Sequence, residues 1–216
     1  QKICIIGGGL TGLVTAISLS RLKCQIDLIT ENHNQNIKSS RTIAISENNF
    51  EFFDKLSISK SLKNILWPCT VMKLYEADRN NKFSKVFEFN NNKKKAKIFY
   101  MTENFKINNL LTKKIKKIKS ISIKKHKRIS KIKTNGLLKS IKINNKELKY
   151  NLIIICTGSK SDLVKNIFQN DVIENSYGEL SITTILKHDK IFNNTARQIF
   201  LDDEILALLP ISNNRT

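Results

Sequence analysis

Four residues near the start of the chain have the types and spacing that bind an adenine dinucleotide. Gly7, Gly9 and Gly12 belong to the run GGGLTG, and Glu31 stands nineteen residues after Gly12. The first glycine of this pattern allows a tight turn, the second lets a pyrophosphate approach the backbone, and the third lets a helix pack closely on a sheet. The carboxylate of Glu31 can accept hydrogen bonds from both ribose hydroxyls, which disfavours a 2′-phosphate. The pattern predicts FAD or NAD rather than NADP, and spacing alone leaves FAD and NAD open.

The segments around the glycine run must position these residues, and their apolar patterns predict a βαβ unit. Ile3–Ile6 is an apolar run of strand length, residues 13–22 carry apolar side chains at helical spacing, and Ile26–Ile29 is a second apolar run. A helix that begins at the glycine turn directs its N–H groups and the positive end of its dipole toward phosphates. We therefore expect the pyrophosphate to lie against Gly7, Gly9, Leu10, Thr11 and Gly12.

The composition is that of a globular chain with one large domain or two small ones. The chain has 216 residues, of which 40% are hydrophobic. No apolar run approaches the roughly 18–20 residues of a membrane span. The first apolar run has strand length and ends in glycines, so we expect no signal peptide and a cytoplasmic protein, at most peripheral to the inner membrane. The four cysteines and three histidines lack metal-site spacing, so we expect no metal and reduced, buried cysteines.

The net charge of +20 indicates anionic partners, and much of it falls between Lys113 and Lys133. Two interpretations remain open for this stretch. It can be a surface for anionic lipid, or a solvated face in a chain whose composition is biased toward Lys, Asn and Ile. No aromatic residues alternate with the lysines, so bases would find no stacking platform. We therefore expect no nucleic-acid partner.

The rest of the chain mixes strands and helices in an α/β pattern. Ser46 is a plausible helix N-cap, and a second helix is expected to begin at residues 102–104. Residues 120–150 are expected to form a small antiparallel meander. The apolar run at residues 151–156 is typical of a parallel strand buried on both faces. Further strands are expected at residues 71–77, 86–89, 96–100, 179–187, 198–201 and 205–209.

Beyond the glycine run, the whole chain resembles the group A FAD-dependent aromatic hydroxylases. Within that family it is most similar to the ubiquinone-biosynthesis branch, the 2-polyprenyl-6-methoxyphenol hydroxylases. The first part of the resemblance is GGGLTG with Glu31. The other segments that carry it are SRTIAIS (40–46), YMTENFKINNLL (100–111), LIIICTGSKSDL (152–163), YGELSITTILKH (177–188) and TARQIFLDDEILALLPIS (195–212).

The resemblance implies an FAD-binding Rossmann-like domain with a parallel central sheet, and an antiparallel substrate-domain sheet. The first would comprise residues 1–70 and 95–175, without its C-terminal part, and the second residues 71–94 and 176–216. It also implies an enzyme that hydroxylates a phenolic ring, here a polyprenyl phenol, with NAD(P)H as reductant and oxygen. The cofactor residues it implies are the five named above with Glu31, Arg41, Asn104, Thr157 and Gly158.

The chain departs from the family pattern at two places. Thr157 stands where the family has an aspartate, and the sequence ends before the family's second flavin motif. A threonine can donate a hydrogen bond but supplies no charge. No side chain stands out as a catalytic base. Two alternatives therefore stay open: an FAD- or NAD-binding oxidoreductase that does not hydroxylate, and a basic binding or scaffold protein that keeps the fold without the chemistry.

Overall fold

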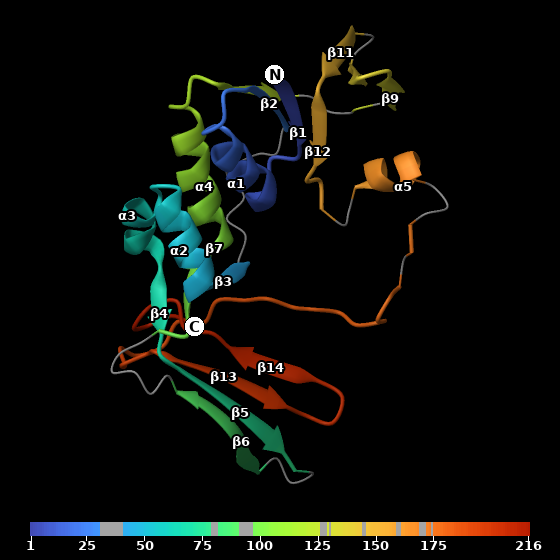
Figure 1. Cartoon of the computed structure of the whole chain (residues 1–216). Helices are drawn as coiled ribbons and strands as arrows, with labels where there is room; N and C mark the ends of the chain where they lie inside the picture. Colours follow the sequence, from blue (N-terminus) through green and yellow to red (C-terminus); the bar gives the residue numbers. More distant parts are fainter. Residues whose placement is uncertain are drawn as a thin grey trace. The chain divides into compact units, whose positions relative to one another are not determined.

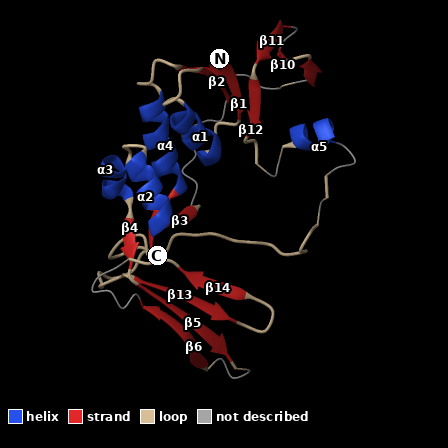
Figure 2. Cartoon of the chain, viewed as in Figure 1, coloured by secondary structure: helices blue, strands red, loops and turns tan. Residues whose placement is uncertain are grey.

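The computed structural model describes residues 1–30, 41–78, 82–90, 97–125, 129, 131–143, 146–158, 161–168, 172–173 and 175–216 (Figures 1 and 2). The chain divides into two compact units. Unit 1 comprises Gln1–Ile37 and Asn108–Ser181, and unit 2 comprises Lys38–Ile107 and Ile182–Thr216. The expected assignment of residues to a flavin domain and a substrate sheet follows different boundaries and stays a prediction.

Unit 1 is built on a parallel sheet with the strand order β12-β1-β2-β8 in its described part. The expected βαβ unit is confirmed, because β1 and β2 are parallel neighbours and helix α1 connects them. Figure 1 shows α1 beside this sheet. The buried isoleucines and leucines of β1 and β2 explain why these runs form central strands. The elements are β1 (Lys2–Ile6), α1 (Leu10–Leu19), β2 (Gln25–Thr30), β8 (Ile121–Lys125) and β12 (Leu152–Ile155).

An antiparallel meander of β9 (Lys131–Asn135), β10 (Leu138–Ile143) and β11 (Lys146–Tyr150) packs on the parallel sheet. Its inner side chains join Cys4, Ile6 and Ile29 in one apolar cluster. The expected meander is confirmed for these three strands. The prediction was wrong for residues 121–125, which form β8 and pair with β2 in parallel.

The apolar run at residues 151–156 forms a parallel strand as expected, but not one buried on both faces. Strand β12 lies at the edge of the described sheet, and its side chains are half-buried or exposed. A short helix, α5 (Asp162–Phe168), follows it. Strand length and hydrophobicity alone do not distinguish an edge strand from a central one, because both bury apolar side chains.

Unit 2 contains a three-stranded antiparallel sheet with the order β3-β7-β4. Ser46 caps helix α2 as expected, because its hydroxyl accepts a hydrogen bond from the Asn49 amide at 3.3 Å. Helix α4 begins at Asn104 directly after β7, also as expected, and runs from unit 2 into unit 1. The elements are β3 (Thr42–Ser46), α2 (Glu47–Lys55), α3 (Ser59–Leu62), η1 (Lys63–Ile65), β4 (Trp67–Cys69), β7 (Phe99–Glu103) and α4 (Asn104–Ile115).

The second sheet of unit 2 is mixed, with the order β14-β13-β5-β6 in the described residues. Its central pair, β13 and β5, is parallel, and the two outer strands are antiparallel to their neighbours. Figure 2 shows these strands lying side by side. The strands are β5 (Val71–Ala77), β6 (Phe83–Asn90), β13 (Thr195–Phe200) and β14 (Ile205–Leu208).

The strand expected at residues 179–187 is absent from the structure. Residues 179–186 form no strand ladder. Leu186 exchanges backbone hydrogen bonds with Thr216 at 2.8 and 3.1 Å, and Lys187 makes an isolated bridge to Arg215. The alternating apolar side chains are exposed, at 88% for Leu180 and 86% for Ile182. Alternation predicts a strand only where a neighbouring strand accepts its hydrogen bonds, and no described strand lies beside this segment.

Candidate cofactor site

The glycine run forms a sharp turn at the carboxyl end of β1. Gly7 has a φ of +121°, and its amide donates to the Ile29 carbonyl at 2.9 Å. A Cβ on Gly7 would lie 2.2 Å from the Cys156 carbonyl oxygen, and a Cβ on Gly12 would lie 1.9 Å from the Gly7 oxygen. Both positions therefore require glycine, for the turn and for close helix packing, as the sequence predicts.

Gly9 differs from the other two glycines because the described residues leave the space in front of it open. A Cβ built on Gly9 would meet no described atom within 4 Å, and its backbone is in an ordinary extended conformation. Gly9 is the N-cap of α1, where no side chain caps the helix and no acidic residue occupies the first turn. The N–H groups at this helix end can therefore receive an anion such as a pyrophosphate.

The end of strand β12 forms the other side of the turn. The Cys156 amide donates to the Ile6 carbonyl at 2.7 Å, which places Thr157 and Gly158 next to the glycine run. Gly158 has a φ of +76°. The Thr157 hydroxyl oxygen is buried and has no hydrogen-bond partner among the described residues. An unpaired buried hydroxyl beside an open, glycine-lined helix end fits a bound polar group such as a dinucleotide.

Strand β2 ends beside the same turn. A Cβ on Gly8 would lie 2.6 Å from the Thr30 side chain. Glu31, the expected ribose ligand, comes directly after Thr30 and lies outside the described residues. The carboxyl ends of β1, β2 and β12 thus meet at the edge where parallel α/β sheets bind ligands.

The structure brings Arg41 and Asn104 together in unit 2. The Asn104 amide donates to the Arg41 carbonyl at 2.9 Å, where β3 and β7 pair with Thr42 opposite Glu103. The glycine turn, Thr157 and Gly158 lie together in unit 1. The expected cofactor residues that the structure describes therefore form two groups, one within each unit.

Sequence reasoning missed Glu103, a buried carboxylate next to Asn104. It accepts hydrogen bonds from both terminal nitrogens of Arg215, at 3.1 and 3.4 Å, and pairs with Lys106 at 2.5 Å. Burial alone would raise the pKa of Glu103, but the hydrogen bonds from Lys106 and Arg215 hold it below its usual value. These ion pairs fix the position of the end of β7 and of the start of α4.

Asp27 is a second buried carboxylate that the sequence analysis did not single out. It lies in β2 and is 5% exposed. Its Oδ2 accepts hydrogen bonds from the Tyr150 hydroxyl at 2.8 Å and the Lys124 ammonium at 2.7 Å, and Lys2 approaches it at 3.2 Å. Asp27 therefore joins β1, β2, β8 and the meander. An acid inside the apolar run Gln25–Thr30 was the available signal, because buried acids require partners.

Burial makes the thiols of Cys4 and Cys69 poor nucleophiles at neutral pH. All four are free thiols, and Cys4, Cys24 and Cys69 are buried, as expected. Burial raises the pKa of Cys4 and of Cys69 to about 12, so both remain protonated. The described His, Cys, Asp and Glu side chains form no cluster that could hold a metal ion. No helix in the described part of the chain is long and apolar enough to span a membrane.

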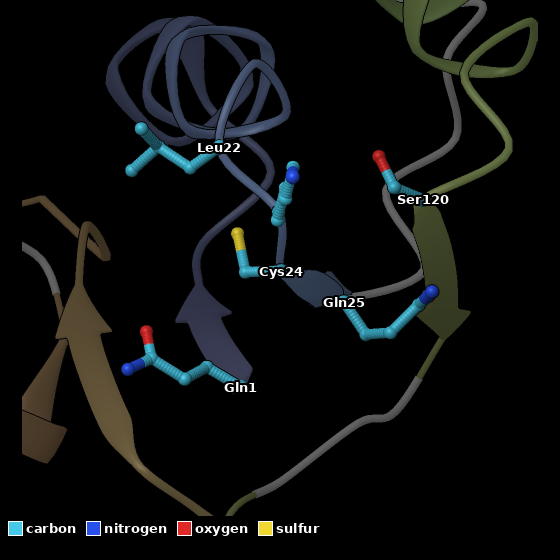
Figure 3. A pocket seen from close by; sticks show the side chains of 6 residues that line it. Gln1, Leu22, Cys24, Gln25 and Ser120 are labelled. Carbon is cyan, nitrogen blue, oxygen red and sulfur yellow. The ribbon is translucent and has the colours of Figure 1, made fainter.

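A shallow hollow lies at the amino ends of the parallel strands, and Figure 3 shows the side chains around it. Its volume is about 250 Å³. Backbone hydrogen bonds from Gln25 to Gln1 and from Ile26 to Ser120 place it at the edge opposite the glycine turn. Ligands of parallel α/β sheets bind at the carboxyl ends of the strands, so this hollow belongs to no part of the dinucleotide site. It is lined by Gln1, Leu22, Lys23, Cys24, Gln25 and Ser120.

Solved structures with the same fold cover nearly all of this chain. Pseudomonas aeruginosa PqsL in complex with 2-aminobenzoylacetate matches 99% of the chain with a TM-score of 0.79 and 12% identity. Klebsiella pneumoniae HpxO, a variant complexed with FAD, matches 99% with a TM-score of 0.71 and 13% identity. The 2,6-dihydroxypyridine-3-hydroxylase of Arthrobacter nicotinovorans matches 95% with a TM-score of 0.69 and 16% identity. The chain spans 58%, 55% and 50% of these three proteins.

The sequence itself was compared with curated proteins and with protein-family models. The sequence has no match among curated proteins. The family model for pyridine nucleotide-disulphide oxidoreductases matches residues 1–178, which include the glycine turn and the end of β12. These residues make up most of the chain and contain the dinucleotide cradle described above. The chain therefore belongs to the pyridine nucleotide-disulphide oxidoreductase family.

Proposed function

We propose that the protein is an FAD-dependent monooxygenase that hydroxylates a phenolic ring, with NAD(P)H as the reductant and oxygen as the second substrate. The observation that carries the proposal is the cradle of unit 1, where an open helix end at Gly9 lies beside the unpaired hydroxyl of Thr157. Two of the similar structures support it, since one is an FAD complex and the other is a hydroxylase of 2,6-dihydroxypyridine.

Each of the predicted cofactor residues would bind one part of FAD. The N–H groups at the start of α1, with Gly7, Gly9 and Gly12, bind the pyrophosphate. Glu31 accepts hydrogen bonds from the adenosine ribose, and the Thr157 hydroxyl donates one to the cofactor. Arg41 binds a phosphate or ribityl oxygen, for which its guanidinium is suited, and Asn104 forms a hydrogen bond near the ribityl chain.

When bound, FAD supplies the activation of oxygen for transfer to an electron-rich ring. The protein's part is to hold the ring, orient it and exclude water. We assign substrate binding to the mixed sheet of unit 2, because one of its faces is apolar and partly exposed. Phe87 lies opposite Leu74, Phe89 lies opposite Met72, and the two phenylalanine rings are 4.5 Å apart. Such a face suits a phenol with an apolar tail, and a polyprenyl phenol is our proposed substrate.

Spectroscopy of the purified full chain tests the proposal. We expect FAD to bind and give a flavin absorbance spectrum, and NAD(P)H to bleach it. Under oxygen, a prenylated phenol should yield a hydroxylated product detectable by mass spectrometry, in greater amount than the same phenol without its tail. NAD(P)H oxidation without any hydroxylated product would support a non-hydroxylating oxidoreductase instead. A protein that stays colourless with added FAD would support a binding or scaffold protein.

Replacing Thr157 by valine should weaken FAD binding without lowering the stability of the folded protein. Valine has nearly the same shape but no hydroxyl, so we expect the FAD dissociation constant to rise about tenfold, the effect of losing one hydrogen bond of roughly 1.4 kcal/mol. The melting temperature of the FAD-free protein should stay the same or rise, because an unpaired buried hydroxyl is removed. Thr157→Ser is the matched control and should retain wild-type affinity. Equal FAD affinity in T157V and the wild type would refute the role of this hydroxyl.

A further inference from the structure

The positive charge of the chain is concentrated in one part of unit 1. Residues 113–149 contain fourteen lysines and one arginine but a single acidic residue, Glu147. This segment therefore carries a net charge of +14 out of the +20 of the whole chain. It comprises the end of α4, strand β8 and the strands of the meander up to the penultimate residue of β11. The dinucleotide cradle uses none of these residues.

The register of the meander places several of its lysines on the face opposite its isoleucines. Ile141 pairs with Ile132 on one side and with Leu148 on the other, and Ile141 is fully buried. Ser140, one residue earlier, pairs with Lys133 and Lys149. Because side chains alternate along a strand, these two lysines lie on the outer face of the meander, away from the apolar cluster.

The lysines of this outer face are exposed. Lys133, Lys142 and Lys149 are all exposed, and Glu147 lies opposite Lys142 in the ladder. The ammonium of Lys124 in β8 is bound to the buried Asp27, and Lys124 is not part of this face. The exposed Lys113, Lys116 and Lys117 at the end of α4 add to the charge of unit 1.

We infer that the outer face of the meander, defined by Lys133, Lys142 and Lys149, is a docking surface for the anionic headgroups of a lipid bilayer. Lysine ammonium groups are point charges that suit a diffuse negative surface, at about 1 kcal/mol or fivefold in affinity per residue. Arginine is the preferred residue for nucleic-acid recognition, and single strands are bound by stacking on aromatic side chains. The described meander strands contain no arginine, and their aromatic residue, Tyr150, is buried and bound to Asp27.

The surface also has a use for the proposed chemistry, although the inference does not depend on it. A polyprenyl phenol resides in the bilayer, so a protein held at the headgroups meets it at a higher local concentration. The docking is measured without FAD, NAD(P)H or substrate, so that failure of the docking and failure of the proposed hydroxylation are separate results.

The test compares two charge reversals of equal size on different surfaces. Lys133→Glu with Lys149→Glu changes the outer face of the meander. The matched control, Lys55→Glu with Lys60→Glu, makes the same change at exposed positions of α2 and α3 in unit 2. Binding of the full chain is measured by sedimentation with vesicles of phosphatidylcholine, with and without phosphatidylglycerol, at low and high salt. Far-ultraviolet circular dichroism verifies that each variant is folded.

We expect the wild type to bind only the vesicles that contain phosphatidylglycerol, and less as salt rises. The meander variant should lose on the order of 25-fold in partition coefficient, and the control less than about threefold. Equal losses in both variants would mean that net charge alone attracts the protein, and the docking surface would be refuted. Absence of vesicle binding, or tighter binding to duplex DNA or single-stranded RNA at the same salt, would overturn it as well.

Discussion

Gly9→Ala is expected to weaken FAD binding on the order of 100-fold while leaving the FAD-free protein as stable as the wild type. A Cβ at this position meets no described atom within 4 Å, and alanine readily adopts the backbone conformation of Gly9. The methyl group would therefore cost nothing in the free protein. It would occupy the space through which the pyrophosphate approaches the start of α1, and 100-fold in affinity corresponds to about 2.7 kcal/mol. Flavin fluorescence titration and thermal melting measure the two effects.

Gly12→Ala is the matched control, since it makes the same chemical change three residues away. Its Cβ would lie 1.9 Å from the Gly7 carbonyl oxygen, so the helix must move away from the turn. We expect the free energy of unfolding to fall by about 3 kcal/mol, the upper part of the range for overpacking. If G9A bound FAD as tightly as the wild type, the pyrophosphate would not lie against Gly9 and the dinucleotide site would be refuted. If the melting temperature of G9A were much lower than that of the wild type, the space in front of Gly9 would not be open.

Asp27→Asn is expected to lower the free energy of unfolding by about 3 kcal/mol. The carboxylate is buried and bound to Tyr150 and Lys124, and removing one partner of a buried ion pair leaves the other uncompensated. We expect a loss at the lower end of the range for broken buried ion pairs, because both lysines retain access to water. The Lys124 side chain is 29% exposed and the Lys2 side chain is 44% exposed. Urea denaturation followed by circular dichroism measures the effect.

The destabilisation caused by D27N should be larger near neutral pH than in acid. Burial would raise the pKa of Asp27, but the hydrogen bonds from Lys124, Tyr150 and Lys2 outweigh burial and lower it. A lowered pKa means that the carboxylate contributes stability above its ordinary pKa of about 3.9, and loses it as pH falls through the lower pKa of the folded state. The difference between wild type and D27N should therefore be constant near neutral pH and shrink in acid.

Tyr150→Phe separates the hydrogen bond from the ion pairs at Asp27. It removes the hydroxyl and keeps the buried ring, so we expect a loss of about 1.5 kcal/mol, the value of a hydrogen bond to a charged group. This loss should be smaller than that of D27N. A D27N protein as stable as the wild type at neutral pH would show that the cluster does not hold unit 1 together.

The glycine turn could be predicted in detail because its causes are local. Gly7 adopts a φ of +121°, and Gly12 packs within a few residues of it in the chain. Backbone sterics decide both positions, and they depend on a residue and its near neighbours. The cap of α2 by Ser46 was predictable for the same reason, since its hydrogen bond spans three residues.

Strand partners could not be predicted in the same way. Residues 121–125 joined the parallel sheet rather than the meander, and residues 179–186 joined no described sheet. The alternation of apolar residues gives the period of a strand, but the partner depends on which sheet edge is available after the other strands have paired.

The βαβ unit, the dinucleotide turn and the α/β class could be predicted from the sequence alone. The spacing of apolar residues and the steric properties of glycine both act over a few residues. Only the tertiary structure decided that Thr157 lies beside Gly7 with its hydroxyl unpaired, that Glu103 is held by Arg215, and that Asp27 binds Tyr150. These contacts join residues more than a hundred positions apart. Their partners are set by the way strands assemble and bury one another's polar groups, which no local pattern specifies.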